Sequence, residues 1–163
     1  MYKLLLDSDA LIKISKAEFL DAAAENFDLS ITEEVFEETV VQGKKGFYPD
    51  ADKIERLIQD GEIKILKGSY RKKRESPKQS FGKGELSIFQ AYSKGSLIVT
   101  DDFSFTSYLN KVHIKSVSSA HLLYVLVKKN KLKKDKVFDC LEKLKPFIRK
   151  EIYKLIKTDI EGE

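Results

Sequence analysis

Short apolar runs alternate with helix-like patterns along most of the chain, and this alternation constrains the fold more than any other feature of the sequence. The apolar runs predict strands at residues 3–6, 27–31, 62–66, 97–100 and 114–117. Helical spacing of apolar residues predicts helices at 11–25, 32–43, 50–59, 86–92, 103–110 and 119–129. Strands that alternate with helices form parallel sheets covered by helices on both faces. We therefore predict an α/β fold of three layers, α/β/α, with a central, mostly parallel sheet.

The chain has 163 residues, which is enough for one domain with a substantial core and too few for two. Residues 1–130 contain all the predicted strands and are expected to form the main body of that domain. Residues 131–163 show no strand signal and predict two helices separated at Pro146. We expect this C-terminal extension to pack on the same domain.

Composition excludes several classes of protein. Apolar residues make up 42% and charged residues 34% of the chain, which is typical of a globular protein and not of a disordered one. The single cysteine, Cys140, rules out an intrachain disulfide and a cysteine-rich zinc site. We find no apolar run of signal-peptide length at the N-terminus and none of the roughly 20 residues that a membrane span needs. We expect a cytoplasmic protein without a membrane partner.

Acidic residues stand directly after two of the predicted strands. Asp7 follows three leucines. Asp101 and Asp102 follow the predicted strand Leu97–Thr100, whose first three residues are apolar. In open α/β sheets, ligands bind outside the carboxyl ends of the strands. Two strands that end in aspartate therefore direct carboxylates towards the same end of the sheet.

Two predicted helices carry a glutamate on the face that otherwise looks apolar. Glu38 lies three residues after Val35 and seven after Ile31, and Glu85 precedes Ile88 and Phe89 at helical spacing. Clustered, buried carboxylates repel one another, so they either take up protons or bind cations. No lysine or arginine stands at the strand ends to pair with them. An all-oxygen set of ligands favours Mg²⁺ or Mn²⁺ over zinc.

The alternative is that each acid has only a structural role. A single aspartate after a strand is usually a turn former or a helix cap, and Glu85 suits the positive end of a helix dipole. Four acids at matching topological positions favour a metal site over four separate caps.

These motifs, in their order and spacing, resemble PIN-domain nucleases over residues 3–117. The motifs are LLLDSDALI (4–12), ITEEVFEE (31–38), GKGELSIFQAYSKG (82–95) and LIVTDDFSF (97–105). The tail at 149–163 is similar to that of small prokaryotic PIN proteins related to VapC-type toxins. The resemblance implies a PIN-like nuclease domain at 1–130. The basic loop that the composition predicts at 67–83 departs from the compact toxins of this family.

The resemblance also implies a role for each acid. Asp7, Glu38, Glu85 and Asp102 match the four catalytic acids of the family, with Glu37 as the less suitable neighbour of Glu38. The implied metal ligands are Asp7, Glu85, Asp101 and Asp102, and whether Asp101 or Asp102 is the main ligand stays open. Thr100 is a supporting residue, and so is Asp9, which either binds metal through water or caps the helix expected from Leu11.

The activity that the resemblance implies is metal-dependent hydrolysis of RNA by an endoribonuclease, either a toxin paired with an antitoxin or a housekeeping RNA-processing enzyme. A non-catalytic RNA-binding PIN protein is the rival interpretation. Expected partners are single-stranded RNA, an antitoxin protein and a second copy of the chain. Arg71, Lys72, Lys73 and Arg74 in the basic loop are candidates for binding the RNA backbone, with a merely solvated loop as the alternative.

Overall fold

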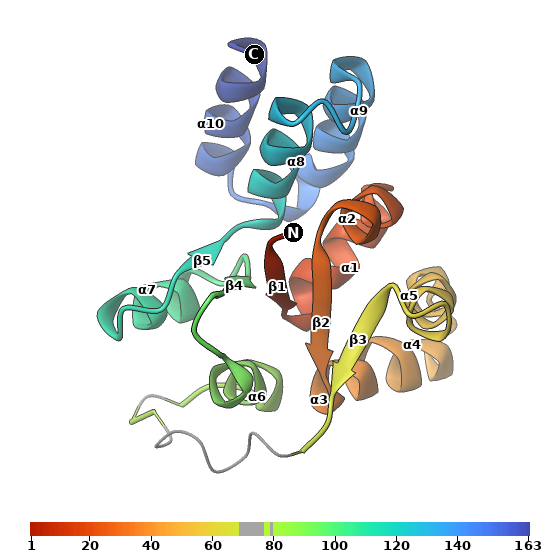
Figure 1. The fold of residues 1–163 in the computed structure, drawn as a ribbon, viewed down its shortest axis with the longest axis vertical. Coiled ribbons are helices and arrows are strands. Elements are labelled where there is room, and N and C mark those ends of the chain that lie inside the picture. Colours follow the sequence, from red (N-terminus) through yellow and green to blue (C-terminus); the bar gives the residue numbers. More distant parts are fainter. Residues whose placement is uncertain (69–76, 79) are drawn as a thin grey trace.

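The computed structural model describes residues 1–68, 77, 78 and 80–163. These residues form an all-parallel, five-stranded sheet in the order β3-β2-β1-β4-β5 (Figure 1). The strands are β1 (Lys3–Leu6), β2 (Asp28–Thr32), β3 (Ile63–Leu66), β4 (Ser96–Val99) and β5 (Ser116–Val117). The predicted α/β fold with a central parallel sheet is confirmed.

Ten α-helices connect or follow the strands in the described part of the chain. In order they are α1 (Ser8–Lys16), α2 (Leu20–Asn26), α3 (Glu33–Phe36), α4 (Gln42–Lys45), α5 (Pro49–Gln59), α6 (Lys83–Ala91), α7 (Phe103–Lys111), α8 (Ser119–Lys128), α9 (Lys134–Leu144) and α10 (Lys150–Glu161). A π-helical turn, Glu37–Val41, joins α3 to α4, and a 3-10 turn, Lys145–Phe147, follows α9.

The strand order creates a switch point between β1 and β4. From β1 the chain adds β2 and then β3 on one side, whereas β4 and β5 are added on the other side. Because β-α-β connections are right-handed, α1 to α5 cover one face of the sheet and α6 and α7 cover the other (Figure 1). A crevice outside the carboxyl ends of the strands at such a switch point is where ligands bind in open α/β sheets.

The central strands are buried on both faces, as their continuous apolar sequences predict. Leu4, Leu5 and Leu6 of β1 are at most 3% exposed, and Ile98 and Val99 of β4 are fully buried. The two strands pair in register from Lys3↔Ser96 to Leu6↔Val99. This buried pairing fixes where the residues after Leu6 and Val99 emerge.

The helix boundaries differ from prediction at two places near the site. Helix α1 begins at Ser8 rather than Leu11, because the Asp7 side chain caps it. The helix expected over 32–43 is interrupted by the π-helical turn, which has Glu38 as its second residue. Strand β5 is also shorter than predicted and excludes Ile114, although that side chain is buried.

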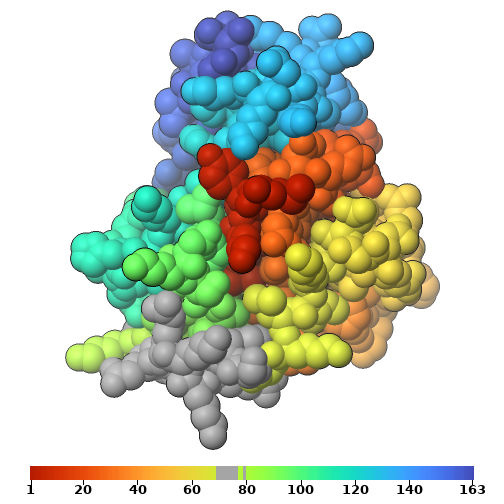
Figure 2. Space-filling view, viewed as in Figure 1, coloured from red at the N-terminus to blue at the C-terminus, as the bar shows by residue number. Residues whose placement is uncertain are grey.

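The C-terminal helices pack against α8 and α1 (Figures 1 and 2). Tyr153, Ile156 and Ile160 of α10 are buried, and so is Cys140 of α9, which packs in the core as a free thiol. No helix of residues 1–68, 77, 78 and 80–163 is long and apolar enough to cross a membrane.

Replacing Ile156 with alanine tests whether α10 belongs to the same cooperative unit as the sheet. Ile156 is 1% exposed, so we expect Ile156→Ala to reduce the free energy of unfolding by about 2–5 kcal/mol in a single transition. The matched control is Leu155→Ala, because Leu155 is the neighbouring residue and is 56% exposed. Urea unfolding followed by circular dichroism measures both variants. Two separate transitions, with only one shifted by Ile156→Ala, would show that α10 unfolds independently.

Candidate active site

Asp7 lies at the carboxyl end of β1 and is the most deeply buried acid of the candidate site. Its side chain is 4% exposed and caps α1, with Oδ1 accepting a hydrogen bond of 2.8 Å from the Ala10 N–H. The pKa of Asp7 is raised to about 7, mainly by burial and in smaller part by the charges of Asp101 and Asp9, while hydrogen bonds from Thr100 and Ala10 oppose the rise. Asp7 forms no ion pair with a described residue.

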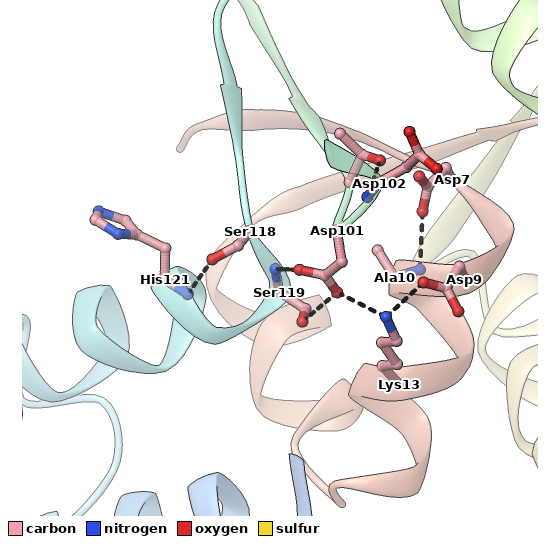
Figure 3. A network of polar contacts seen from close by, with 10 residues as sticks. Asp7, Asp9, Ala10, Lys13, Asp101, Asp102, Ser118, Ser119 and His121 are labelled. Atoms are coloured by element: carbon pink, nitrogen blue, oxygen red, sulfur yellow. Dashed lines mark hydrogen bonds and ion pairs between the residues drawn. The ribbon is translucent and has the colours of Figure 1, made fainter. Parts of the chain in front are cut away.

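Thr100 connects Asp7 with Asp102. The buried Thr100 side chain is hydrogen-bonded to the Asp7 carboxylate, and its Oγ1 accepts a 3.2 Å hydrogen bond from the Asp102 N–H. Asp102 follows β4 and caps α7, with Oδ1 accepting a 2.5 Å hydrogen bond from the Phe105 N–H. Figure 3 shows Asp7 and Asp102 where the chain leaves these two strands. The pairing of β1 with β4 thus places both aspartates at the switch point.

Asp101 has a different environment from Asp102, although the two are neighbours in the sequence. Its Oδ1 accepts a 3.0 Å hydrogen bond from the Ser119 N–H and its Oδ2 a 2.6 Å bond from the Ser119 hydroxyl (Figure 3). The Lys13 Nζ lies 3.7 Å from the same Oδ2. Both oxygens of Asp101 are therefore held by protein groups, and the carboxylate connects the end of β4 to α1 and α8.

The expectation that no cation would pair with these acids is wrong for Asp101 and Asp9. Lys13 contacts Asp101 and also forms an ion pair of 2.5 Å with Asp9, one turn earlier on α1. Asp9 is largely exposed and does not cap the helix, because Asp7 has that role. The capping alternative for Asp9 is therefore wrong. Sequence reasoning missed Lys13 because helix α1 was expected to begin three residues later.

Glu38 reaches the same end of the sheet from the π-helical turn. Its Oε2 accepts a hydrogen bond from the hydroxyl of Ser8, the residue after Asp7. On its other side Glu38 contacts the start of α6, where a Cβ added to Gly84 would lie only 3.0 Å from Oε2. Glycine at position 84 therefore gives the carboxylate room beside α6. Glu38 is half-buried whereas Glu37 is exposed, so Glu38 is the acid that faces the site.

Glu85 is the residue after Gly84 and lies in the first turn of α6. Its carboxylate is half-buried and turns back towards Gly82. It has no hydrogen bond or ion pair with any other described residue. The start of α6 thus contacts the Glu38 carboxylate through Gly84 and carries Glu85 as the next residue.

The oxygen ligands of the candidate site suit a hard divalent cation, but the described residues do not form a complete coordination site. Asp7, Glu38, Glu85 and Asp102 present only carboxylate oxygens, which suit Mg²⁺ and Mn²⁺. Among the described residues, no three histidine, cysteine, aspartate or glutamate side chains lie close enough together to hold one ion. Asp7 and Asp102 each use Oδ1 for a helix cap, and the Asp7 carboxylate is also hydrogen-bonded to Thr100, whereas Oδ2 of Asp102 has no hydrogen-bond partner in that part of the chain.

Sequence reasoning missed two small residues of this site, Ser8 and Gly84. Each stands next to a predicted acid, Ser8 after Asp7 and Gly84 before Glu85. That adjacency was the available signal, but only the tertiary structure shows that both contact Glu38. Arg71, Lys72, Lys73 and Arg74, predicted to bind RNA, lie outside the described residues.

The raised pKa of Asp7 predicts a stability that falls as the pH rises. Between about pH 4 and pH 7 the folded protein retains a proton on Asp7 that the unfolded chain has lost, and above pH 7 the full cost of a buried charge is present. In chelator at pH 8, Asp7→Asn should be more stable than the parent by up to about 4 kcal/mol, since asparagine keeps the cap without the charge.

Urea unfolding at pH 4.5 and pH 8 measures this difference, with Asp60→Asn as the control because Asp60 is exposed. The advantage of Asp7→Asn should shrink to about 1 kcal/mol at about pH 4.5, because the folded parent still holds its proton on Asp7 there and little of the cost of the buried charge has developed. An advantage that is the same at both pH values would contradict the assignment of the raised pKa to Asp7.

Comparison with known protein families gives one match that spans nearly the whole chain. Residues 3–161 match the family described as PIN domain (DUF3368). No curated protein matches the chain significantly. The family match and the all-parallel sheet, with acids at its switch point, agree on the same fold. The chain therefore belongs to the PIN-domain family, whose members are generally nucleases and typically bind divalent metals.

Proposed function

We propose that this protein is a metal-dependent endoribonuclease, with Asp7, Glu38, Glu85 and Asp102 as its catalytic acids. The observation that carries the proposal is the environment of Asp7. This carboxylate is buried at the switch point, has no cation partner in the described part of the chain, and has a pKa raised to about 7. Such a group is costly to the fold, and a bound cation removes that cost.

Asp7, Glu85 and Asp102 are the proposed metal ligands, with Glu38 completing the set. A bound Mg²⁺ or Mn²⁺ lowers the pKa of a water molecule and offsets negative charge on the phosphodiester. We assign Asp101 a positioning role instead, because Ser119 and Lys13 occupy both of its oxygens. Asp9, paired with Lys13, is a supporting residue at the entrance to the site.

The polar residues around the acids hold them in position. Thr100 holds the Asp7 carboxylate on one side and the backbone of Asp102 on the other, so its hydroxyl sets the separation of two proposed ligands. The Ser8 hydroxyl donates a hydrogen bond to the Glu38 carboxylate and holds it in a similar way. Hydrogen bonds of this kind to ligating carboxylates orient them, and losing one typically costs 10–100-fold in metal affinity or activity.

RNA is the proposed substrate. The enzyme acts either as a toxin with an antitoxin partner or as an RNA-processing enzyme. The chain carries a net charge of +4, and its basic residues 71–74 suit a phosphate backbone. A homodimer is part of the same proposal. A non-catalytic RNA-binding protein is the alternative that the following experiment separates.

Cleavage assays on the adjacent pair Glu38 and Glu37 provide the sharpest test of the proposed site. The parent protein should cleave single-stranded RNA with Mg²⁺ or Mn²⁺ and not with chelator. Glu38→Gln and Asp102→Asn should each reduce the rate by at least about a hundredfold, since each removes a proposed metal ligand. Glu37→Gln is the matched control and should retain activity, because Glu37 is exposed.

Equal losses in Glu37→Gln and Glu38→Gln, or full activity in Asp102→Asn, would refute the proposed set of catalytic acids. Binding of RNA without cleavage under either metal would favour the non-catalytic alternative. Cleavage of DNA in preference to RNA would identify a nuclease with a different substrate.

A further inference from the structure

A pocket of about 320 Å³ lies between the end of β4 and the C-terminal helices. Thr100 and Asp101, at the end of β4, form the part of its wall nearest the acids. Phe103, at the start of α7, lines it as well, and Phe147 and Arg149 contribute from the connection between α9 and α10. Because Thr100 also contacts Asp7 and Asp102, a molecule in this pocket would be adjacent to the proposed reaction centre.

Two exposed aromatic rings line this pocket. Phe103 is 64% exposed and Phe147 is 43% exposed, so both rings present apolar surface to a molecule in the pocket. Each ring also has a cation above it. Arg149 lies 4.8 Å from the centre of the Phe103 ring, and Lys16 lies 5.2 Å from the centre of the Phe147 ring. Aromatic rings and arginine planes are the surfaces on which unpaired bases stack.

The charge of the pocket is opposite to that of the neighbouring acids. Lys13 and Arg149 line it, and Asp101 is the one carboxylate among the lining residues that the structure describes. The oxygens of Asp101 already bind Ser119 and Lys13. Arg149 pairs with no carboxylate in the same part of the chain, so its guanidinium is available to an anion.

We propose that this pocket binds one unpaired nucleotide of the RNA substrate, with the base stacked on Phe103 and the adjoining phosphate contacted by Arg149. The inference rests on the proposed nuclease function and extends it by assigning a nucleotide subsite, with its stacking and phosphate contacts, next to the end of β4. The volume is at the small end of the range for ligand pockets, which suits a single nucleotide rather than a duplex. A base within a duplex has its faces covered by its neighbours and cannot stack on Phe103.

Equilibrium binding of fluorescein-labelled RNA, followed by anisotropy in chelator, tests the pocket without any cleavage. The probes are a short single-stranded RNA, the same strand with abasic sites, and the corresponding duplex. The pocket variants are Phe103→Ala, Phe103→Leu and Arg149→Ala. The matched controls are Leu155→Ala and Lys154→Ala, which remove an exposed apolar side chain and an exposed charge from α10 outside the pocket.

Phe103→Ala should weaken binding of the single-stranded RNA about tenfold, because one stacked base is lost. Phe103→Leu should weaken it similarly, since leucine keeps the apolar bulk and lacks the aromatic face. Neither change should affect the abasic strand. Arg149→Ala should weaken binding of both strands and reduce the slope of affinity against salt by about one, as expected for one phosphate contact. The controls should bind like the parent protein.

The inference is overturned if the pocket variants bind RNA like their controls, or if Phe103→Ala weakens binding of the abasic strand and the intact strand equally. Cleavage of the same RNA with Mn²⁺, measured in parallel, separates this failure from that of the proposed function. If the parent protein cleaves RNA and Phe103→Ala leaves KM unchanged, the proposed nuclease function stands and the proposed nucleotide pocket is refuted. A parent protein that neither binds nor cleaves RNA refutes both.

Discussion

The pairing of β1 with β4 is the contact on which the rest of the site depends. The two strands are about ninety residues apart in the sequence, and their in-register pairing places Asp7 opposite Thr100 and close to Asp102. Because the strand order reverses between them, the connecting helices diverge to opposite faces of the sheet and leave the carboxyl ends of both strands accessible. Glu38 and Glu85 then approach from helices on the two different faces, and Gly84 allows their segments to come close. Four positions that are distant in sequence thus meet at one end of the sheet.

The acids of the site have structural and proposed catalytic roles at once. Asp7 and Asp102 each accept a capping hydrogen bond on one carboxylate oxygen, and this bond fixes the direction of the other oxygen. Asp101, Ser119 and Lys13 form a neighbouring network in which every carboxylate oxygen is occupied, and this network anchors the end of β4 to α1 and α8. Asp7 and Asp102 are therefore helix caps, as the structural alternative for a single aspartate proposed. Capping uses only one of the two oxygens of each carboxylate. The burial of Asp7 is the part that capping does not explain, since an exposed cap would stabilise α1 without the cost that raises its pKa.

The fold and the approximate place of the site were predictable because both follow from local patterns. Apolar runs that alternate with amphipathic segments specify a parallel sheet, and an aspartate directly after such a run must emerge at its carboxyl end. The separation of Asp101 from Asp102 was not predictable, because it depends on Ser119 and Lys13, which only the tertiary structure brings to Asp101. The π-helical turn at Glu38 likewise has no signal in the periodicity of its apolar residues, because α3 and α4 on either side have only four residues each and are too short to show the change of register. The pocket at Phe103 and Arg149 was also not predictable from the sequence, because its walls come from segments more than forty residues apart.

A crystal structure of the protein grown with Mn²⁺, with data collected at the manganese absorption edge, tests the central claim most directly. The account predicts an anomalous peak at the switch point, bonded to carboxylate oxygens of Asp7, Glu85 and Asp102, with Glu38 bound directly or through water. It also predicts that Asp101 stays hydrogen-bonded to Ser119 and does not reach the metal. The absence of a peak at this position at saturating Mn²⁺, or a peak held by other residues, would contradict the claim that these acids are brought together to bind a cation.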